Sequence, residues 1–392
     1  MAHCNSVMGS FFFFVISFFV TLVTHAEAQM VPAVFVFGDS LVDVGNNNHI
    51  KSLTKANFPH NGIDFPGQKP TGRFTNGKNA ADFLAEKLGL PTSPPYLSLV
   101  SASNKSNAFL GGVSFASGGA GIMDATNKLF VSLSIDQQID YYATVYGELV
   151  QQLGSVGTQQ LLSKSMFGVV IGSNDMLGYF GPKSTLRQKI TPQQLVDLML
   201  STLRGQLTRI YNLGARKFVM IGVGAIGCCP SQRNQNKTQA CNEEANYWSH
   251  TYNEGIKALL LGMKSKYTDI NYSFFDTHAM LLNFIQDPVK YGTTIYLSLF
   301  IINLSNVRAS DTTIKLYYYN MLVISSKLEN NLFFDAGARD CRKQYSSASN
   351  IHKNHDGCPR KDLKENASYI TTEEDVHVGR PKRDLSAICG LD

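Results

Sequence analysis

Three short motifs combine a hydroxyl group, backbone amides and a side-chain amide, the groups that nucleophilic attack on a carbonyl requires. Residues 38–41 read Gly-Asp-Ser-Leu, residues 111–121 include five glycines, and residues 172–175 read Gly-Ser-Asn-Asp. A serine hydroxyl at a tight turn is exposed for attack on an ester carbonyl, and the developing oxyanion needs hydrogen-bond donors already aimed at it. Whether Ser40, the glycine-rich loop and Asn174 act together depends on the fold.

Each motif by itself has an ordinary structural explanation. Glycine-rich segments form tight turns, serine is common at helix N-termini, and an asparagine amide often caps a turn. A phosphate-binding loop is not supported, because no Gly-Lys-Ser/Thr sequence closes the glycine-rich segment and no Gly-x-Gly-x-x-Gly sequence opens a helix there. The joint placement of the three motifs relative to the predicted strands favours a functional site.

Apolar runs closed by glycine predict buried strands, and amphipathic segments between them predict helices. The predicted strands cover residues 33–37, 167–171, 217–221 and 270–275, and the predicted helical segments cover residues 79–88, 191–214 and 242–266. Strands that alternate with helices favour a parallel sheet with helices on both faces. Ligands bind beyond the carboxyl ends of such strands, and Ser40 and Asn174 follow two of them.

Five sequence blocks resemble the motifs of one known family, the plant GDSL esterase/lipases, which are a branch of the SGNH hydrolases. In chain order these blocks lie at residues 35–48, 72–77, 115–121, 171–175 and 227–230. The first block contains Gly-Asp-Ser-Leu and the third reads Phe-Ala-Ser-Gly-Gly-Ala-Gly, and both are highly specific to the family. The resemblance spans residues 31–292.

The resemblance implies an α/β fold with three layers, in which helices flank a parallel sheet of the SGNH or flavodoxin-like hydrolase type. It also implies that Ser40 is the nucleophile, and that the backbone N–H groups of Ser40 and Gly118 and the side-chain amide of Asn174 form the oxyanion hole. The expected enzyme is a carboxylic ester hydrolase that acts on lipid or cell-wall acyl esters, with no metal and no organic cofactor. The expected partner is a small-molecule ester or lipid substrate.

The general base is the part of the family pattern that this sequence lacks. The family supplies it from an Asp-x-x-His block near the C-terminus, but no Asp after residue 280 is followed three positions later by His. His278 follows a predicted strand and is the remaining candidate, with an ordinary loop histidine as its alternative role. His355 and His377 lie in a segment rich in charged residues, where solvated side chains are the simpler interpretation.

The point where the resemblance ends divides the chain. Residues 1–28 are predicted to be a signal peptide, residues 29–292 the hydrolase domain, and residues 293–392 an atypical segment, irregular or aberrant in structure. An altered reading of the gene, such as a retained intron or a wrong exon join, would explain the sequence after Gly292. Two other functions follow as alternatives: a catalytically impaired secreted protein that binds a lipid or glycan, and a structural cell-wall or adhesion protein.

Composition and the N-terminus predict a globular protein outside the cell. Hydrophobic residues make up 44% of the chain and charged residues 17%, and a net charge of +5 without a run of five like charges predicts no nucleic-acid surface. Residues 11–23 are apolar and residues 26–28 have the form of a signal-peptidase site, whereas a membrane anchor needs roughly 20 apolar residues. We therefore expect secretion, with the cell wall or apoplast implied by the resemblance, and no stable membrane span.

Secretion would expose the chain to glycosylation and to oxidising conditions. Glycosylation sequons begin at Asn104, Asn236, Asn271, Asn303 and Asn366. Asn271 lies in a predicted strand and is therefore discounted. Six cysteines follow the signal peptide, and they lack the spacing of a zinc site. The pairing that we expect is a disulfide between Cys228 and Cys241, which would close a polar loop.

Overall fold

A computed structural model of the chain describes residues 30–100 and 107–287. The predicted signal peptide and the predicted segment after Gly292, with His355 and His377, lie outside the described residues. None of the helices in the two described ranges has the length and hydrophobicity that a membrane span requires.

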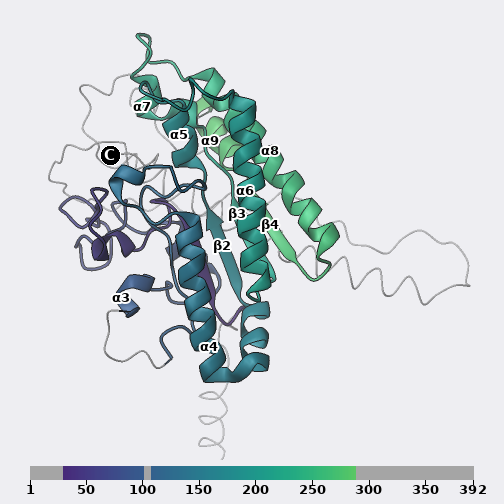
Figure 1. Cartoon of the computed structure of the whole chain (residues 1–392). Helices are drawn as coiled ribbons and strands as arrows, with labels where there is room; N and C mark the ends of the chain where they lie inside the picture. Colours follow the sequence, from purple (N-terminus) through teal and green to yellow (C-terminus); the bar gives the residue numbers. More distant parts are fainter. Residues whose placement is uncertain (1–29, 101–106, 288–392) are drawn as a thin grey trace, which may run out of the picture.

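Four parallel strands form the centre of the molecule, in the order β1-β2-β3-β4 (Figure 1). Their bounds are Val34–Gly38, Met166–Val170, Lys217–Ile221 and Asn271–Phe275. The register pairs Val34 with Met166 and Lys217 with Asn271, so all four strands end at the same edge of the sheet. Each strand lies within one residue of its predicted position, because short apolar runs are typical of strands buried on both faces.

The glycine-rich loop runs along the other side of β1, away from β2. The Val36 N–H donates to the Val113 carbonyl at 2.9 Å, and the Phe115 N–H donates to the Val36 carbonyl at 2.8 Å. Ser114 forms a parallel bridge with Val36. The sequence did not predict this pairing, because its glycines indicate turns more strongly than extended structure.

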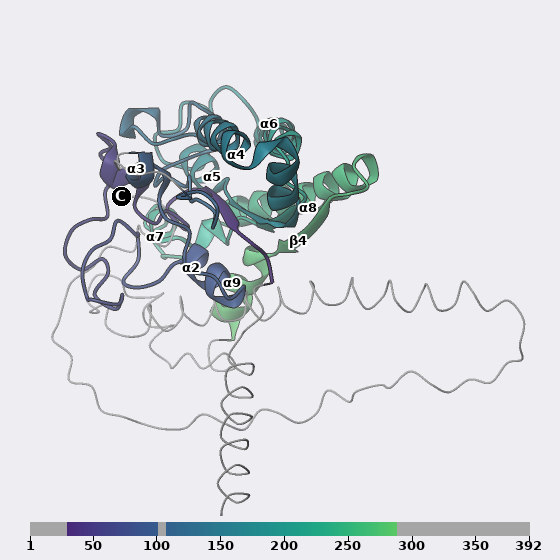
Figure 2. The ribbon, with the colours of Figure 1, turned by 90° about the horizontal axis from the view of Figure 1, so that it is seen from below.

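Helices cover both faces of the sheet, and Figure 2 shows the layers from below. One face carries α4 (Ile135–Lys164), α6 (Pro192–Asn212) and α8 (Glu243–Lys266), and the other carries α2 (Ala80–Lys87) and α9 (Thr277–Gln286). Alternate residues of β1 divide between the two cores, with Phe35 and Phe37 in the larger and Val34 and Val36 in the smaller. The predicted three-layer α/β fold is confirmed.

Sequence signals located three of these helices but missed a fourth. The side chains of the residues that precede α2, α6 and α8 accept hydrogen bonds from N–H groups in the first turn of each helix. These residues are Asn79, Thr191 and Asn242, respectively. The 30-residue helix α4 was not predicted, although Ser134 and Gln137 form a capping box at its start. Gly154 interrupts α4 with non-helical backbone angles, which weakens the periodic signal.

Short helical segments and one disulfide complete the described fold. The helical segments are α3 (Tyr96–Val100), α5 (Ser173–Tyr179), α7 (Pro230–Arg233), and the 3-10 turns η1 (Asn46–His49), η2 (Lys128–Phe130) and η3 (Ile226–Cys228). Cys228 and Cys241 form a disulfide, with their Cα atoms 4.4 Å apart. The predicted pairing is therefore confirmed.

Candidate active site

The chain makes a tight turn directly after β1 and buries Ser40 in it. The Asp39 carbonyl accepts the N–H groups of Val42 and Asp43 at 3.2 and 3.0 Å, and the Asp39 carboxylate accepts the Leu41 N–H at 3.0 Å. These bonds form one helical turn at the carboxyl end of the strand. Among the described residues, neither the Ser40 hydroxyl nor the Ser40 N–H has a hydrogen-bond partner, so both are available to a reacting group.

Gln138 of α4 fixes the start of this turn. Its side-chain oxygen accepts the Gly38 N–H at 2.9 Å, and its side-chain nitrogen donates to the Gly38 carbonyl at 2.8 Å and to the Leu133 carbonyl at 2.9 Å. Position 38 requires glycine, because a Cβ atom there would lie 2.3 Å from the Val170 carbonyl oxygen. Sequence reasoning missed Gln138, since its role depends on a contact 100 residues away in the chain.

Asn174 lies in the first turn of α5, directly after β2, the strand paired with β1. Its Nδ2 donates to the Ala120 carbonyl at 2.9 Å, which joins α5 to the glycine-rich loop. The amide nitrogen carries two hydrogens, so one remains for an oxyanion. Gly172 permits the turn before Asn174, because its φ is +114° and a Cβ atom there would lie 3.0 Å from the Tyr252 ring.

The Gly118 N–H is engaged within the protein, which differs from the free donor that we expected. It donates to Asp43 Oδ2 at 2.9 Å, while Asp43 Oδ1 accepts the N–H groups of Gly45 and Asn46 at 2.7 and 2.8 Å. An oxyanion would have to share the Gly118 N–H with this carboxylate. The N–H of the next residue, Gly119, has no acceptor in the part of the chain that the structure describes, so it is a second candidate donor that the sequence did not indicate.

Three carboxylates are buried around the turn that carries Ser40, and their burial raises their pKa values. Burial raises the pKa of Asp39 to about 7, and the charges of Asp175 and Asp43 add to this effect. Burial raises the pKa of Asp43 to about 6, although the N–H groups that it accepts oppose the shift. Burial also raises the pKa of Asp175, which accepts hydrogen bonds from residues 122–126. Asp39 is therefore partly protonated near neutral pH.

Two further side chains support the loop that follows Ser40. Asn46 donates through Nδ2 to the carbonyls of Ser114 and Ala116 at 2.8 and 2.9 Å, which ties this loop to the segment beside β1. Arg73 forms a buried, bidentate ion pair with Asp82 of α2, at 2.8 and 2.7 Å. Arg73 also donates through Nη1 to the Val44 carbonyl at 3.4 Å, so both side chains contact the loop that follows Ser40.

No hydrogen bond joins His278 to Ser40 in the part of the chain that the structure describes. His278 lies on α9 after β4, and β2 and β3 separate β4 from β1, which corresponds to about 14 Å across the sheet. Its ring lies 5.6 Å from the ring of His250, and its Nε2 has no hydrogen-bond partner among the described residues. Burial lowers the pKa of His278. The fold therefore favours the ordinary structural role over that of general base.

The described residues include one cluster with ligand types suited to a metal ion. Side-chain ligand atoms of His250, Glu254 and Asp276 lie within 4.8 Å of one another. The Lys257 ammonium already contacts Glu254 at 2.6 Å and Asp276 at 3.1 Å and so offsets part of their negative charge. Asp276 of this cluster follows β4, three strands along the sheet from β1 and Ser40.

Comparison with known proteins agrees with the geometry at this edge of the sheet. The family model described as GDSL-like Lipase/Acylhydrolase matches residues 34–335. The match begins at β1 and includes the turns that hold Ser40, Gly118 and Asn174. It also extends past Gly292, where the resemblance was expected to end.

Two similar proteins are GDSL esterase/lipases of Arabidopsis thaliana. One is 47% identical over 269 residues, which is 67% of this chain and 71% of the relative. The other is 39% identical over 283 residues, which is 70% of this chain and 79% of the relative. Among solved structures, an acetylxylan esterase from Geobacillus stearothermophilus is 12% identical, covers 75% of this chain and 93% of its own, and has a TM-score of 0.34.

Proposed function

This chain belongs to the GDSL-like lipase/acylhydrolase family and is a carboxylic ester hydrolase, and we propose that Ser40 is its nucleophile. The observation that carries the proposal is the position of Ser40. Ser40 follows β1 at the carboxyl edge of the sheet, beside the turn that carries Asn174. Its hydroxyl makes no hydrogen bond to any described residue. That edge is where parallel α/β sheets place their ligands.

In the first step, Ser40 Oγ bonds to the carbonyl carbon of the ester while its proton passes to a base, and the carbonyl oxygen becomes an oxyanion. The Ser40 N–H and the second Nδ2 hydrogen of Asn174 are the donors available to that oxygen. The N–H groups of Gly118, shared with Asp43, and of Gly119 are the candidates for a third donor.

In the second step, the oxyanion collapses and the carbon–oxygen bond of the ester breaks, so that the alcohol leaves with the proton from the base. The acyl group remains bonded to Ser40. Water then adds to the acyl carbonyl, the same base accepts its proton, and collapse of the second oxyanion releases the carboxylic acid and restores the Ser40 hydroxyl. The same amide donors serve both oxyanions.

For the substrate and location, we propose acyl esters of lipids or of the cell wall, reached by secretion. The apolar N-terminal segment with its cleavage-like site supports secretion. The Cys228–Cys241 disulfide suits an oxidising compartment, and the sequon at Asn236 lies in an exposed loop. Asn271 begins β4, which supports discounting its sequon.

A catalytically impaired protein with the same fold, in which Ser40 does not react at all, is the second candidate. What favours it is the position of His278, which lies beside His250, follows a strand three places along the sheet from β1, and makes no hydrogen bond to Ser40. The family base from an Asp-x-x-His block has no counterpart in the sequence after residue 280. We refer below to a restored chain, in which a family-type C-terminus with that block replaces everything after Gly292.

Labelling with a fluorophosphonate probe separates the two candidates. The full chain and its Ser40→Ala variant are incubated with the probe, and the labelled peptide is identified by mass spectrometry. Preorganised donors alone accelerate attack roughly a thousandfold to ten-thousandfold over water, so we expect slow labelling at Ser40 and none in Ser40→Ala. Labelling of neither protein, at any incubation time, would support the impaired protein instead.

A further inference from the structure

Three apolar side chains, Leu53, Phe130 and Val131, are exposed in loops near the nucleophile turn, and we call them the apolar rim. Leu53 is 72% exposed, Phe130 43% and Val131 50%. Single exposed apolar residues are normal on a protein surface, whereas a contiguous group of them often marks an interaction site. The rim is of interest because its members come from two distant parts of the sequence.

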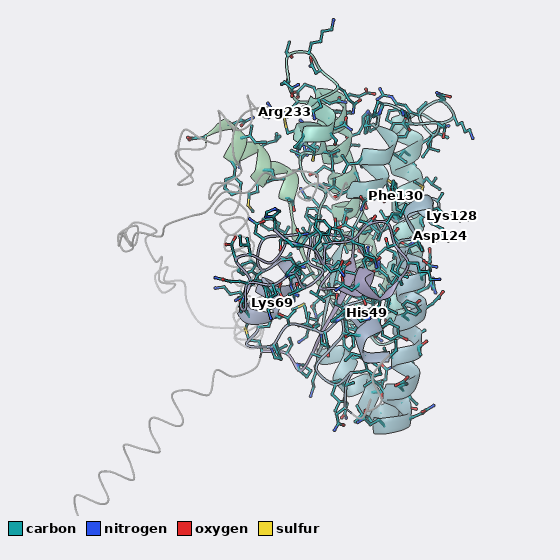
Figure 3. All side chains as sticks on the ribbon, turned by 90° about the vertical axis from the view of Figure 1, so that its left-hand side faces the viewer. His49, Lys69, Asp124, Lys128, Phe130 and Arg233 are labelled. Atoms are coloured by element: carbon teal, nitrogen blue, oxygen red, sulfur yellow. A yellow bond between two sulfur atoms is a disulfide. The ribbon has the colours of Figure 1, made fainter. Side chains whose placement is uncertain are left out.

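Hydrogen bonds hold the two parts of the rim together. The Leu53 N–H donates to the Phe130 carbonyl at 3.1 Å, and the Ser52 hydroxyl donates to the same carbonyl at 2.8 Å. Figure 3 shows Phe130 and Lys128 at the surface of the face that also presents His49. The rim is therefore one surface feature built from residues 52–53 and 130–131.

The backbone is strained where it presents the rim. Val131 has φ 55° and ψ 59°, and Asn127 has φ 49° and ψ 27°, so left-handed residues stand at both ends of η2. Asparagine tolerates this region, but a β-branched valine rarely occupies it. Strain of this kind persists where the surrounding structure imposes it, and it concentrates at ligand-binding segments. The fold thus keeps Phe130 and Val131 exposed although the backbone conformation at Val131 is unfavourable.

The rim is joined directly to the glycine-rich loop of the candidate active site. The Ser132 hydroxyl and the Asn127 side chain both donate to the Gly119 carbonyl at 3.1 Å. Asn47 donates to the carbonyls of Thr54 and Gly118, each at 2.9 Å. Both loops of the rim therefore contact the turn that carries the candidate oxyanion donors.

Positive charge flanks both parts of the rim. Lys51 precedes Leu53 by two residues and Lys128 precedes Phe130 by two residues, and both lysines are exposed. The exposed Asp124 lies near Lys128 in Figure 3 and is an acidic side chain in the same region. Apolar side chains between two lysines are complementary to a lipid surface, which offers acyl chains below a layer of anionic headgroups.

We propose that the apolar rim docks the protein onto an anionic lipid surface and so presents ester substrates from that surface to Ser40. The proposal rests on the proposed function, because it names the form in which the substrate arrives. Leu53, Phe130 and Val131 insert among the acyl chains, and Lys51 and Lys128 contact the headgroups.

Vesicle flotation tests this proposal without requiring hydrolysis. The full chain with Ser40→Ala is mixed with vesicles of phosphatidylcholine and phosphatidylglycerol, and the bound fraction is measured. Adding Leu53→Ser and Phe130→Ser is expected to weaken binding roughly tenfold or more, since two buried apolar side chains are lost from the interface. The matched control carries Val156→Ser and Leu261→Ser, which are 74% and 61% exposed on the remote helices α4 and α8, and it is expected to bind like the parent.

A second pair of variants keeps the test valid if the serine substitutions disturb folding. Lys51→Gln with Lys128→Gln leaves the apolar side chains intact and is expected to reduce binding to the anionic vesicles. Equal binding of the rim variants, the control and the parent would overturn the proposal, as would a dimer of the chain that the rim substitutions dissociate in solution. Loss of vesicle binding by the rim variants supports docking when the same rim substitutions, made in the chain with Ser40 intact, leave fluorophosphonate labelling at Ser40 unchanged. Absence of labelling in the chain with Ser40 intact and no rim substitutions concerns the proposed function alone.

Discussion

At the scale of single residues, the site is defined by which polar atoms the fold uses and which it leaves available. Gln138 and Asp39 engage the backbone on both sides of Ser40, yet the Ser40 hydroxyl and N–H keep no internal partner among the described residues. Asn174 donates one amide hydrogen to the Ala120 carbonyl, and the other amide hydrogen remains available. Residue types and their places after strands indicated Ser40 and Asn174, but only the fold shows that Gly118 donates to Asp43.

Removal of the Asn174 amide tests the oxyanion hole. Asn174→Ala in the restored chain is expected to lower kcat for a p-nitrophenyl ester roughly a hundredfold to a thousandfold, because one preorganised donor is lost at the transition state. KM should change little. The measurement is steady-state turnover of both proteins, with circular dichroism as the control for folding. An unchanged kcat would show that the Asn174 amide does not contact the oxyanion.

The pKa of Asp39 predicts a pH dependence of stability. Burial raises this pKa from 3.8 to about 7, which corresponds to about 4 kcal/mol of unfavourable ionisation in the folded state. A raised pKa means that the protonated carboxyl favours the folded state, and that this contribution is full below pH 4 and is lost as the pH rises through 7. Asp39→Asn should therefore become more stable relative to the parent between pH 4 and pH 8.

Urea unfolding of both proteins at several pH values measures that difference. Groups that do not interact with Asp39 are common to the two proteins and cancel in the comparison. Asp43 and Asp175 lose a neighbouring negative charge in the variant, which stabilises its folded state in the same direction as the pH rises. We expect the difference in the free energy of unfolding, Asp39→Asn minus parent, to increase with pH. A difference that stays constant from pH 4 to pH 8 would mean that Asp39 ionises normally in the folded protein.

At the scale of elements, the sequence predicted the parts whose signals are local. The four strands are short apolar runs, and Thr191-Pro192 starts α6 as a cap followed by proline. The pairing of residues 113–117 with β1 could not be predicted, because it depends on contacts about 80 residues apart that leave no local pattern. Helix α4 was missed although Ser134 caps it, since Gly154 breaks the apolar period.

The Cys228–Cys241 disulfide, which closes a loop in the segment between β3 and α8, should make a measurable contribution to stability. Cys228 and Cys241 are 13 residues apart, and cross-linking a loop of this size stabilises a protein by about 3 kcal/mol through the unfolded state. The double variant Cys228→Ala and Cys241→Ala is expected to lose that amount in the free energy of unfolding, measured by denaturant titration. Peptide mapping of the non-reduced parent is the control, and a map that joins Cys228 to another cysteine would contradict the assignment.

At the scale of the whole molecule, the described residues place the proposed nucleophile Ser40 and the candidate oxyanion donors at one edge of the sheet, whereas His278 follows β4, three strands along the sheet from β1. The altered reading after Gly292 remains a hypothesis about the gene. Sequencing the transcript across that codon tests it directly. The sequence indicated the missing Asp-x-x-His block because the block is a local motif, which can be searched for without knowledge of the fold.

The most direct test of this account is the turnover of a p-nitrophenyl ester by the chain as it stands and by the restored chain, each with and without Ser40→Ala. Loss of the base in comparable catalytic triads lowers turnover by about a millionfold. We predict a rate barely above background for the chain as it stands and a gain of several orders of magnitude in the restored chain. Ser40→Ala should abolish that gain. Equal turnover by the unaltered and restored chains, or restored activity that survives Ser40→Ala, would contradict it.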